Sequence, residues 1–300
     1  MADRPVTGQP ATRAQTDYVV RPLSDPDEIR KLLAPHRAYA AYAIGQLQPG
    51  LIEKTQWHLA RGAAGDALLL HSQGGLGNAL FTLGVGEPLE AMLQLYPGPR
   101  HTFLTCQTRQ QETALRHFVL PVASTMARLH VDRERFQPVE GDVRRLTGRD
   151  VHRINSLYRA DGTAAFYTAA NIDRAIYYGA FEDGRLVAVG GTHVVSALDE
   201  IGVVGNVFTH PLYRGMGFGR RVTGAVTHDV LESCREAVLS VDPANVAAVR
   251  AYERLGFHEV GRLIEGPAVG RDFRPGAFVR RRWAALRGRR YGGELVSLSN

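Results

Sequence analysis

The sequence predicts an α+β protein built as two tandem domains, each a mixed, mostly antiparallel sheet flanked by helices in α/β/α layers. The chain has 300 residues, of which 44% are hydrophobic, so two domains of ordinary size could each bury a core. The same order of strands and helices is predicted twice, with a period of roughly 120 residues. A period of that length indicates two copies of one domain, not a solenoid.

The predicted domains are residues 17–136 and 138–268, with the boundary near Pro138. Residues 1–16 are polar and interrupted by proline and glycine, so we expect a disordered tail. Residues 269–300 are predicted to form a basic C-terminal extension.

The first copy is predicted to have the order β, αα, βββ, α, β, α, β. Two helical stretches within 26–47 are separated near Pro35, because proline interrupts a helix. Two of the three consecutive strands are located on either side of a glycine-rich turn. The located strands are 18–23, 67–73, 79–85, 101–107 and 124–132, and the later helices are 89–96 and 108–119.

The second copy repeats this order. Thr147 is a favourable helix cap, and the helix that follows it is predicted to end near Arg159. Asp183-Gly184 is a turn sequence between two strands. The predicted strands are 142–146, 175–182, 185–195, 201–209, 236–242 and 257–263, and the other helices are 168–173, 217–232 and 245–254.

The positive charge lies at the C-terminal end. The formal net charge is +6, and the eight arginines after residue 265, against Asp272 and Glu294, account for all of it. Residues 1–265 therefore have no net attraction for nucleic acid, which we regard as an unlikely partner. Phe278, Trp283 and Leu286 lie among the arginines, so an RNA contact, an anionic membrane surface and a solvated extension remain open.

The sequence also indicates a cytoplasmic protein. No apolar run approaches the ~18 residues of a membrane helix, so no membrane span is expected. The first residues lack the apolar segment of a secretion signal. Cys106 and Cys234 have no metal-ligand spacing around them, so we expect buried thiols and no metal.

Residues 209–221, THPLYRGMGFGRR, connect a predicted strand to a predicted helix. The start of a helix has unpaired N–H groups and a partial positive charge, which together bind anions. Glycine lets anion oxygens approach the backbone, and Arg214 and Arg220 add positive charge. The stretch therefore predicts a phosphate or pyrophosphate site.

Three types of phosphate-binding loop can be compared with this stretch. A Walker loop requires Gly-Lys-Ser/Thr, which is absent. A dinucleotide fingerprint requires G-x-G-x-x-G at the start of a parallel βαβ unit, whereas this spacing is G-x-G-x-G after three strands. The third pattern, R-x-x-G-x-G, is matched by Arg214, Gly217 and Gly219. A glycine-rich turn without a ligand is the alternative.

Residues 138–265 resemble the GNAT N-acetyltransferase superfamily in element order and in two motifs. In that family R-x-x-G-x-G wraps the pyrophosphate of coenzyme A, and the preceding strand pairs with the pantetheine arm. The second motif is NVAAVRAYERLGF. The resemblance implies an acetyl-CoA-dependent N-acetyltransferase whose acceptor is an amine of a small molecule or peptide, which attacks the thioester directly. It places coenzyme A contacts at Val207, Phe208, Thr209, Arg214, Gly215, Met216, Gly217, Phe218, Gly219, Arg220, Asn245 and Tyr252.

Tyr252 is the predicted proton donor. When an amine attacks a thioester, the departing thiolate needs a proton, and a phenol of pKa ~10 stays protonated at neutral pH. Asn245 lies about two turns earlier on the same helix, at its cap. Packing of Tyr252 with Val249 and Leu255, and capping alone for Asn245, are the structural alternatives.

The sequence has more than one candidate for the general base that takes a proton from the acceptor amine. Many relatives place a glutamate in the middle of the central strand, where this sequence has Gly205 and Asn206. Glu200 at the strand entry and His193 on the previous strand are the candidates, beside a route through water. A solvated hairpin residue and a half-buried histidine, respectively, are the alternatives.

The first copy resembles a GNAT domain that has lost its catalytic activity. Glu87 and Pro88 stand at its helix start, and a carboxylate there neutralises the anion site. Residues 73–79, QGGLGNA, join two strands and read as a hairpin turn. We expect this half to support the second and to wall its acceptor cleft. A non-catalytic acyl-CoA-binding or regulatory module, and an acyltransferase acting on a carrier- or tRNA-linked group, remain alternatives. The acceptor, the acyl chain and the oligomeric state remain open.

Overall fold

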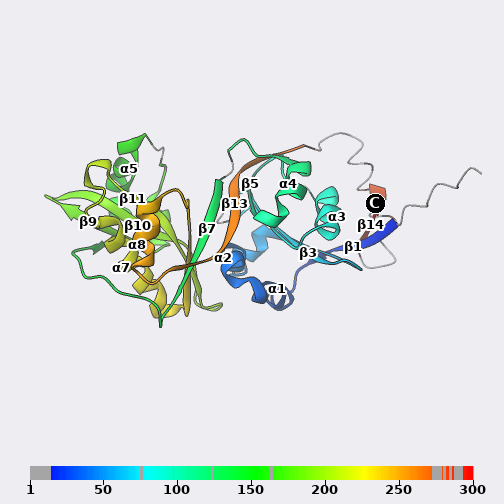
Figure 1. Ribbon diagram of the computed structural model, residues 1–300, viewed down its shortest axis with the longest axis horizontal. Coiled ribbons are helices and arrows are strands. Elements are labelled where there is room, and N and C mark those ends of the chain that lie inside the picture. The colour runs from blue at the N-terminus through cyan, green and yellow to red at the C-terminus, as the bar shows by residue number, and fades with distance from the viewer. Residues whose placement is uncertain are drawn as a thin grey trace, which may run out of the picture.

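Helices and strands follow the predicted order twice along the chain (Figure 1). The computed structural model describes residues 15–74, 77–96, 98–122, 124–162, 165–271, 279, 282, 283, 286 and 293–299. The first series is β1 (Gln15–Leu23), α1 (Pro26–Leu33), α2 (Arg37–Gly45), β2 (Thr55–Gly62), β3 (Gly65–Ser72), β4 (Ala79–Leu83), α3 (Glu87–Leu95), β5 (His101–Gln107), α4 (Gln111–His117), β6 (Phe118–Val119) and β7 (Ser124–Asp132). The second is β8 (Arg144–Arg145), α5 (Val151–Tyr158), α6 (Ala169–Asp173), β9 (Tyr177–Glu182), β10 (Arg185–Ser196), β11 (Ile201–Thr209), α7 (Phe218–Ser233), β12 (Glu236–Val241), α8 (Val246–Glu253) and β13 (His258–Gly270), and β14 (Glu294–Ser299) ends the chain.

The strands form one continuous sheet of 14 strands in the order β14-β1-β2-β3-β4-β5-β13-β7-β12-β11-β10-β9-β8, with β6 beside β13. All neighbouring pairs are antiparallel except β4–β5 and β11–β12. Helices α5 and α7 cover opposite faces of the second half, since they pack in separate apolar clusters on β9 and β10. The predicted mixed, mostly antiparallel sheet flanked by helices is confirmed.

The last strands of the two halves are exchanged. β7 ends the first series along the chain but pairs with β12 of the second half. β13 ends the second series but pairs with β5 of the first half. The two exchanged strands also pair with each other and lie side by side at the centre of the molecule (Figure 1). The ranges 17–136 and 138–268 thus describe the repeat along the sequence, whereas in space each contributes a strand to the other.

The two halves also share an apolar core. Leu33 and Ile44, from the first two helices, are buried in one cluster with Val194, Val203 and Val238 of the second half. Burying apolar side chains of this size stabilises the folded state by about 1.5–3 kcal/mol each. The halves are therefore one packed unit.

Ion pairs add to this contact between the halves. Arg30 Nε lies 2.8 Å from Asp199 Oδ1, and Arg37 Nε lies 2.5 Å from Glu236 Oε1. The other carboxylate oxygen of Glu236 is 2.9 Å from His130 Nε2 on the exchanged strand β7. Glu236 thus connects α2, β7 and β12.

This cluster gives a testable pH dependence. Burial raises the pKa of Glu236, but hydrogen bonds with His130 and Arg37 outweigh it, so the pKa lies below the usual 4.5. A lowered folded-state pKa contributes stability above the unfolded value, and this contribution is lost as the pH falls through the folded value. We expect Glu236→Gln to lower the free energy of unfolding by about 2 kcal/mol at neutral pH, and by less in acid. Urea unfolding at several pH values measures this difference.

Glu232→Gln is the matched control for that measurement. Glu232 lies on α7, its side chain is 71% exposed, and its nearest ionic partner is His228 at 3.8 Å. Removing this carboxylate should leave the acid dependence of unfolding as in the wild type. Equal pH dependence of the wild type and Glu236→Gln would contradict the prediction.

Both ends of the chain differ from the sequence-based expectation. Residues 1–14 lie outside the described residues, but β1 starts at Gln15, inside the predicted tail. Strand β13 continues to Gly270, and β14 pairs with β1 and buries Val296 and Leu298. Parts of the predicted extension 269–300 therefore belong to the sheet, while most of its basic segment lies outside the described residues. The sequence analysis did not locate strands β2, β6 and β14, since it assigned residues 118–119 to a helix and 294–299 to the extension.

None of the helices in the described part of the chain is long and apolar enough to span a membrane.

Candidate active site

The site begins where β11 separates from β12. These parallel strands pair only from Ile201 to Val203 of β11. Beyond that point β11 continues to Thr209 against β10, and its other edge faces no strand in the described part of the chain. Unpaired backbone groups on such an edge can hydrogen-bond an extended ligand. The predicted contact residues Val207, Phe208 and Thr209 lie on this segment.

A bulge at Asn206 shapes this segment. The pairing register with β10 shifts here, and Asn206 has a φ of 52°. Tyr158 donates a hydrogen bond to the Asn206 carbonyl at 2.6 Å. Tyr167 donates to Asn206 Oδ1 at 3.0 Å, and Asn206 Nδ2 donates to Tyr177 at 2.8 Å. Asparagine tolerates left-handed backbone better than glutamate does, which suits this residue type to the position.

The glycine-rich stretch leads from β11 into the start of α7, as the sequence predicts. Gly215 and Gly217 have φ values of 81° and 83°, which only glycine adopts readily. Gly217 is the N-cap without a capping side chain, and the first helical bond runs from Arg221 N to its carbonyl. The backbone N–H groups of residues 215–220 have no acceptor among the described residues. They are available to an anion.

The predicted contacts at this turn differ in their surroundings. Arg214 pairs with Asp161 at 3.0 Å, so its charge is partly neutralised within the protein. Arg220 Nε is buried and has no hydrogen-bond partner among the described residues, so it is a donor that a ligand oxygen would satisfy. Phe218 is 4% exposed and packs in the core, so only its backbone N–H can face a ligand. Met216 is exposed, and Gly219 follows in the first turn of the helix.

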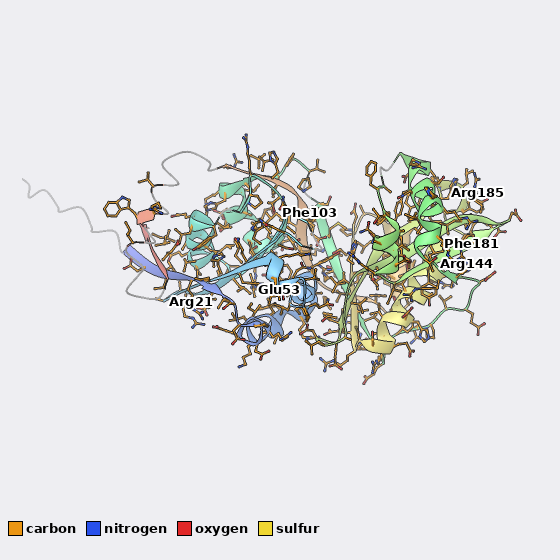
Figure 2. All side chains as sticks on the ribbon, turned by 180° about the vertical axis from the view of Figure 1, so that it is seen from behind. Arg21, Glu53, Phe103, Arg144, Phe181 and Arg185 are labelled. Carbon is orange, nitrogen blue, oxygen red and sulfur yellow. The ribbon has the colours of Figure 1, made fainter. Side chains whose placement is uncertain are left out.

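A cavity of about 730 Å³ lies between the two halves. One wall is formed by residues 204–207 of β11 together with residues 239–242. The opposite wall comes from α2, β4 and β5 of the first half, including Phe103, which lies near the junction of the halves in Figure 2. The arrangement agrees with the expectation that the first half walls a cleft of the second.

Asn245 and Tyr252 both line this cavity. Asn245 caps α8, because its side chain accepts a hydrogen bond from Ala248 N at 3.2 Å. Tyr252 is 8% exposed, and burial raises its pKa to about 12. The phenol therefore keeps its proton at neutral pH. The packing alternative for Tyr252 is also present, since its ring lies against Phe257.

Glu200 is the predicted site residue that the structure separates from the rest. It is exposed at the turn between β10 and β11, with a φ of 54°, and it does not line the cavity. Gly205 is five residues further along the extended chain, roughly 16 Å from Glu200. The geometry thus gives the predicted proton acceptor no access to the splayed strands.

His193 lies closer to the separated part of β11 than Glu200 does. Its ring packs against Gly205 so tightly that a Cβ on this glycine would overlap it. The imidazole is exposed to the cavity. Desolvation within this cavity, together with the charge of Arg128, lowers the pKa of His193 to about 4. His193 is therefore neutral at pH 7 and a weak proton acceptor.

Three residues that the sequence analysis did not single out meet beside His193. Arg128 of β7 is 1% exposed, and its guanidinium lies 3.5 Å from Glu265 Oε1 of β13. The guanidinium also lies 5.2 Å from the ring centre of Tyr42 on α2. Tyr42 and Glu265 line the cavity. An available signal was the position of each charged residue beside apolar residues, in MARL of β7 and LIEG of β13.

The corresponding gap in the first half is filled. Strands β4 and β5 also separate, but Gln110 lies between them with 1% exposure. It accepts hydrogen bonds from Thr82 Oγ1 at 3.1 Å and Gln107 N at 2.6 Å, and donates to the Gly84 carbonyl. At the start of α3, Glu87 accepts a hydrogen bond from Tyr18 at 2.6 Å. Side chains of the protein thus occupy both the gap and the helix start.

Comparisons with known proteins agree with this architecture. The sequence pattern of the acetyltransferase (GNAT) family matches residues 149–257. The fold is similar to that of a Drosophila protein, with a TM-score of 0.58, 14% identity, and coverage of 83% of this chain and 98% of that one. It is also similar to a GCN5-related N-acetyltransferase from Kribbella flavida, with a TM-score of 0.53, 16% identity, and coverage of 80% and 97%.

A GCN5-related N-acetyltransferase from Sphaerobacter thermophilus gives a TM-score of 0.52 at 16% identity, with coverage of 83% of this chain and 95% of that one. No curated protein sequence matches the chain. These structural likenesses extend over both halves and concern the fold alone. Residues 149–257 therefore form a domain of the acetyltransferase (GNAT) family, within a chain whose first half has a GNAT-like fold as well.

Proposed function

We propose that the protein is an acetyl-CoA-dependent N-acetyltransferase that acts on an amine of a small molecule or peptide. The observation that carries the proposal is the open edge of β11. This edge connects the free N–H groups at the start of α7 with the cavity that contains the Tyr252 phenol. A ligand with a pyrophosphate, an extended amide-bearing arm and a reactive end fits that succession of groups.

Each part of the site has a role in this reaction. Residues 215–220 would bind the pyrophosphate, and residues 207–209 would pair with the pantetheine arm. Backbone N–H groups at the bulge would hold the thioester oxygen as it gains charge. The amine attacks the carbonyl carbon, the C–S bond breaks, and Tyr252 donates its proton to the departing thiolate.

The test is to incubate the full chain with acetyl-CoA and a panel of amines while following free thiol and acetylated amine. We expect thiol release that depends on the amine and matches the acetylated product one for one. Binding of acetyl-CoA without such turnover by any amine would instead support a non-catalytic acyl-CoA-binding module. Turnover only with carrier- or tRNA-linked amines would identify the third class of acceptor.

A further inference from the structure

The ionisable lining of the cavity is acidic. Among the described residues that line it, Asp242 and Glu265 are the acidic side chains, and there is no lysine or arginine. His193 adds no positive charge at neutral pH, because its pKa is about 4. The buried guanidinium of Arg128, 3.5 Å from Glu265, offsets one of these two negative charges, and Asp242 leaves the cavity with a net negative charge. A cavity with this lining attracts a cation and repels a carboxylate.

Glu265 is placed to meet a ligand in this cavity. It lies on the exchanged strand β13, opposite Thr105 of β5, and its side chain is 12% exposed. Burial raises the pKa of Glu265, whereas the charge of Arg128 opposes the rise. A carboxylate with a raised pKa is a better proton acceptor at neutral pH.

Arg128 contacts Glu265 but does not itself line the cavity. All three guanidinium nitrogens are buried and lack hydrogen-bond partners among the described residues. They do not reach the cavity surface, so Arg128 cannot bind a ligand there without rearrangement. Its contacts with Glu265 and Tyr42 hold the carboxylate in place. Arg128 is therefore a positioning residue.

The rest of the lining is largely apolar. Leu80, Phe81 and Phe103 come from the first half, and Met126 and Leu239 come from β7 and β12. Walls of this kind bind an apolar or aromatic body, while a few polar groups fix its orientation. In the proposed function the pantetheine arm pairs with the open edge of β11. The part of the cavity that the first half lines then remains for the acceptor.

We infer that Glu265 binds the ammonium group of the acceptor and takes a proton from it, and that the acceptor is a small amine with an apolar body and no carboxylate. This inference rests on the proposed function. One N–H bond breaks as the Glu265 carboxylate gains the proton, and the free amine then forms the C–N bond to the carbonyl carbon. The leaving thiolate takes the Tyr252 proton, the second amine proton restores the phenol, and Glu265 returns its proton to water.

The experiment is a calorimetric titration of phenethylamine into the full chain saturated with coenzyme A, so that no turnover occurs. We expect binding to the wild type, at least about tenfold weaker binding to Glu265→Gln, and similarly weak binding of phenylalanine, which adds a carboxylate. Glu259→Gln is the matched control, because Glu259 lies on the same strand but is exposed and pairs with Arg262. It should bind phenethylamine as the wild type does.

Each other outcome has a defined meaning. Equal binding to the wild type and Glu265→Gln, equal binding of phenylalanine, or no amine binding by a wild type that binds coenzyme A would overturn the inference and leave the proposed function standing. Failure of the wild type to bind coenzyme A would overturn the proposed function itself. If Glu265→Gln does not fold, Glu265→Asp keeps the charge but withdraws it by one methylene, and wild-type affinity in this variant would also overturn the inference.

Discussion

Acetyl-CoA is expected to bind at least about 100-fold more weakly to the Gly217→Glu variant than to the wild type. The new carboxylate would stand at the start of α7, beside N–H groups that have no acceptor among the described residues. Losing two or three charge-assisted hydrogen bonds, at about 1.5–3 kcal/mol each, gives this factor. In the protein without ligand, a Cβ at Gly217 meets no atom within 4 Å, so the substitution adds backbone strain at the φ of 83° but no steric clash.

Two controls separate ligand repulsion from backbone strain. Gly77 also has a positive φ, 68°, and open space around an added Cβ, but it lies in the turn before β4. Gly77→Glu should bind acetyl-CoA normally, and Gly217→Ala should show the strain without the charge. Calorimetry should give one site per chain in the wild type, since Gln110 and Glu87 fill the equivalent gap and helix start. Two sites, or normal binding by a folded Gly217→Glu protein, would place the ligand elsewhere.

Tyr252→Phe is expected to lower the turnover number by about 100-fold or more while leaving acetyl-CoA affinity nearly unchanged. The substitution keeps the ring contact with Phe257 but removes the hydroxyl that faces the cavity. The proton for the thiolate would then have to come from water. Free-thiol release at saturating acetyl-CoA and amine measures the effect when the chemical step limits the rate.

Tyr178→Phe is the matched control. Tyr178 is partly buried and donates a hydrogen bond to Asp229 at 3.2 Å, but it does not line the cavity. Its variant should turn over as the wild type does. Unchanged turnover in Tyr252→Phe, with Tyr178→Phe equally active, would assign Tyr252 to packing alone.

The conformation of the glycine-rich turn at residues 209–221 could be predicted because its determinants are local. The spacing of the glycines specifies positive φ values. The strand before them and the helix after them specify a helix start within about ten residues. The bulge at Asn206 was harder to predict. Its conformation depends on Tyr158 of α5, Tyr177 of β9 and Tyr167 in the segment before α6.

Strand exchange could not be predicted from the element order. β7 and β13 occupy the same place in the two series, so exchanging them leaves the order unchanged. Periodicity shows which residues of a strand are buried but not which strand lies beside it. The exchange brings Arg128 and Glu265 together, which are far apart in sequence. Glu200 was predicted as a proton acceptor because it is close to the central strand in sequence. The structure places it at a turn, where it does not line the cavity.

The pairing of β5 with β13 has a consequence for synthesis on the ribosome. One neighbour of β5, strand β13, is not made until residues 258–270, so this edge of β5 stays open while residues 108–257 are translated. Exposed strand edges pair with other chains, and incomplete domains aggregate. Translation that stops before residue 258 would leave β5 without this partner, and such fragments should depend on chaperones or be degraded. The sheet of the first half is therefore completed only after residues 258–270 have been made.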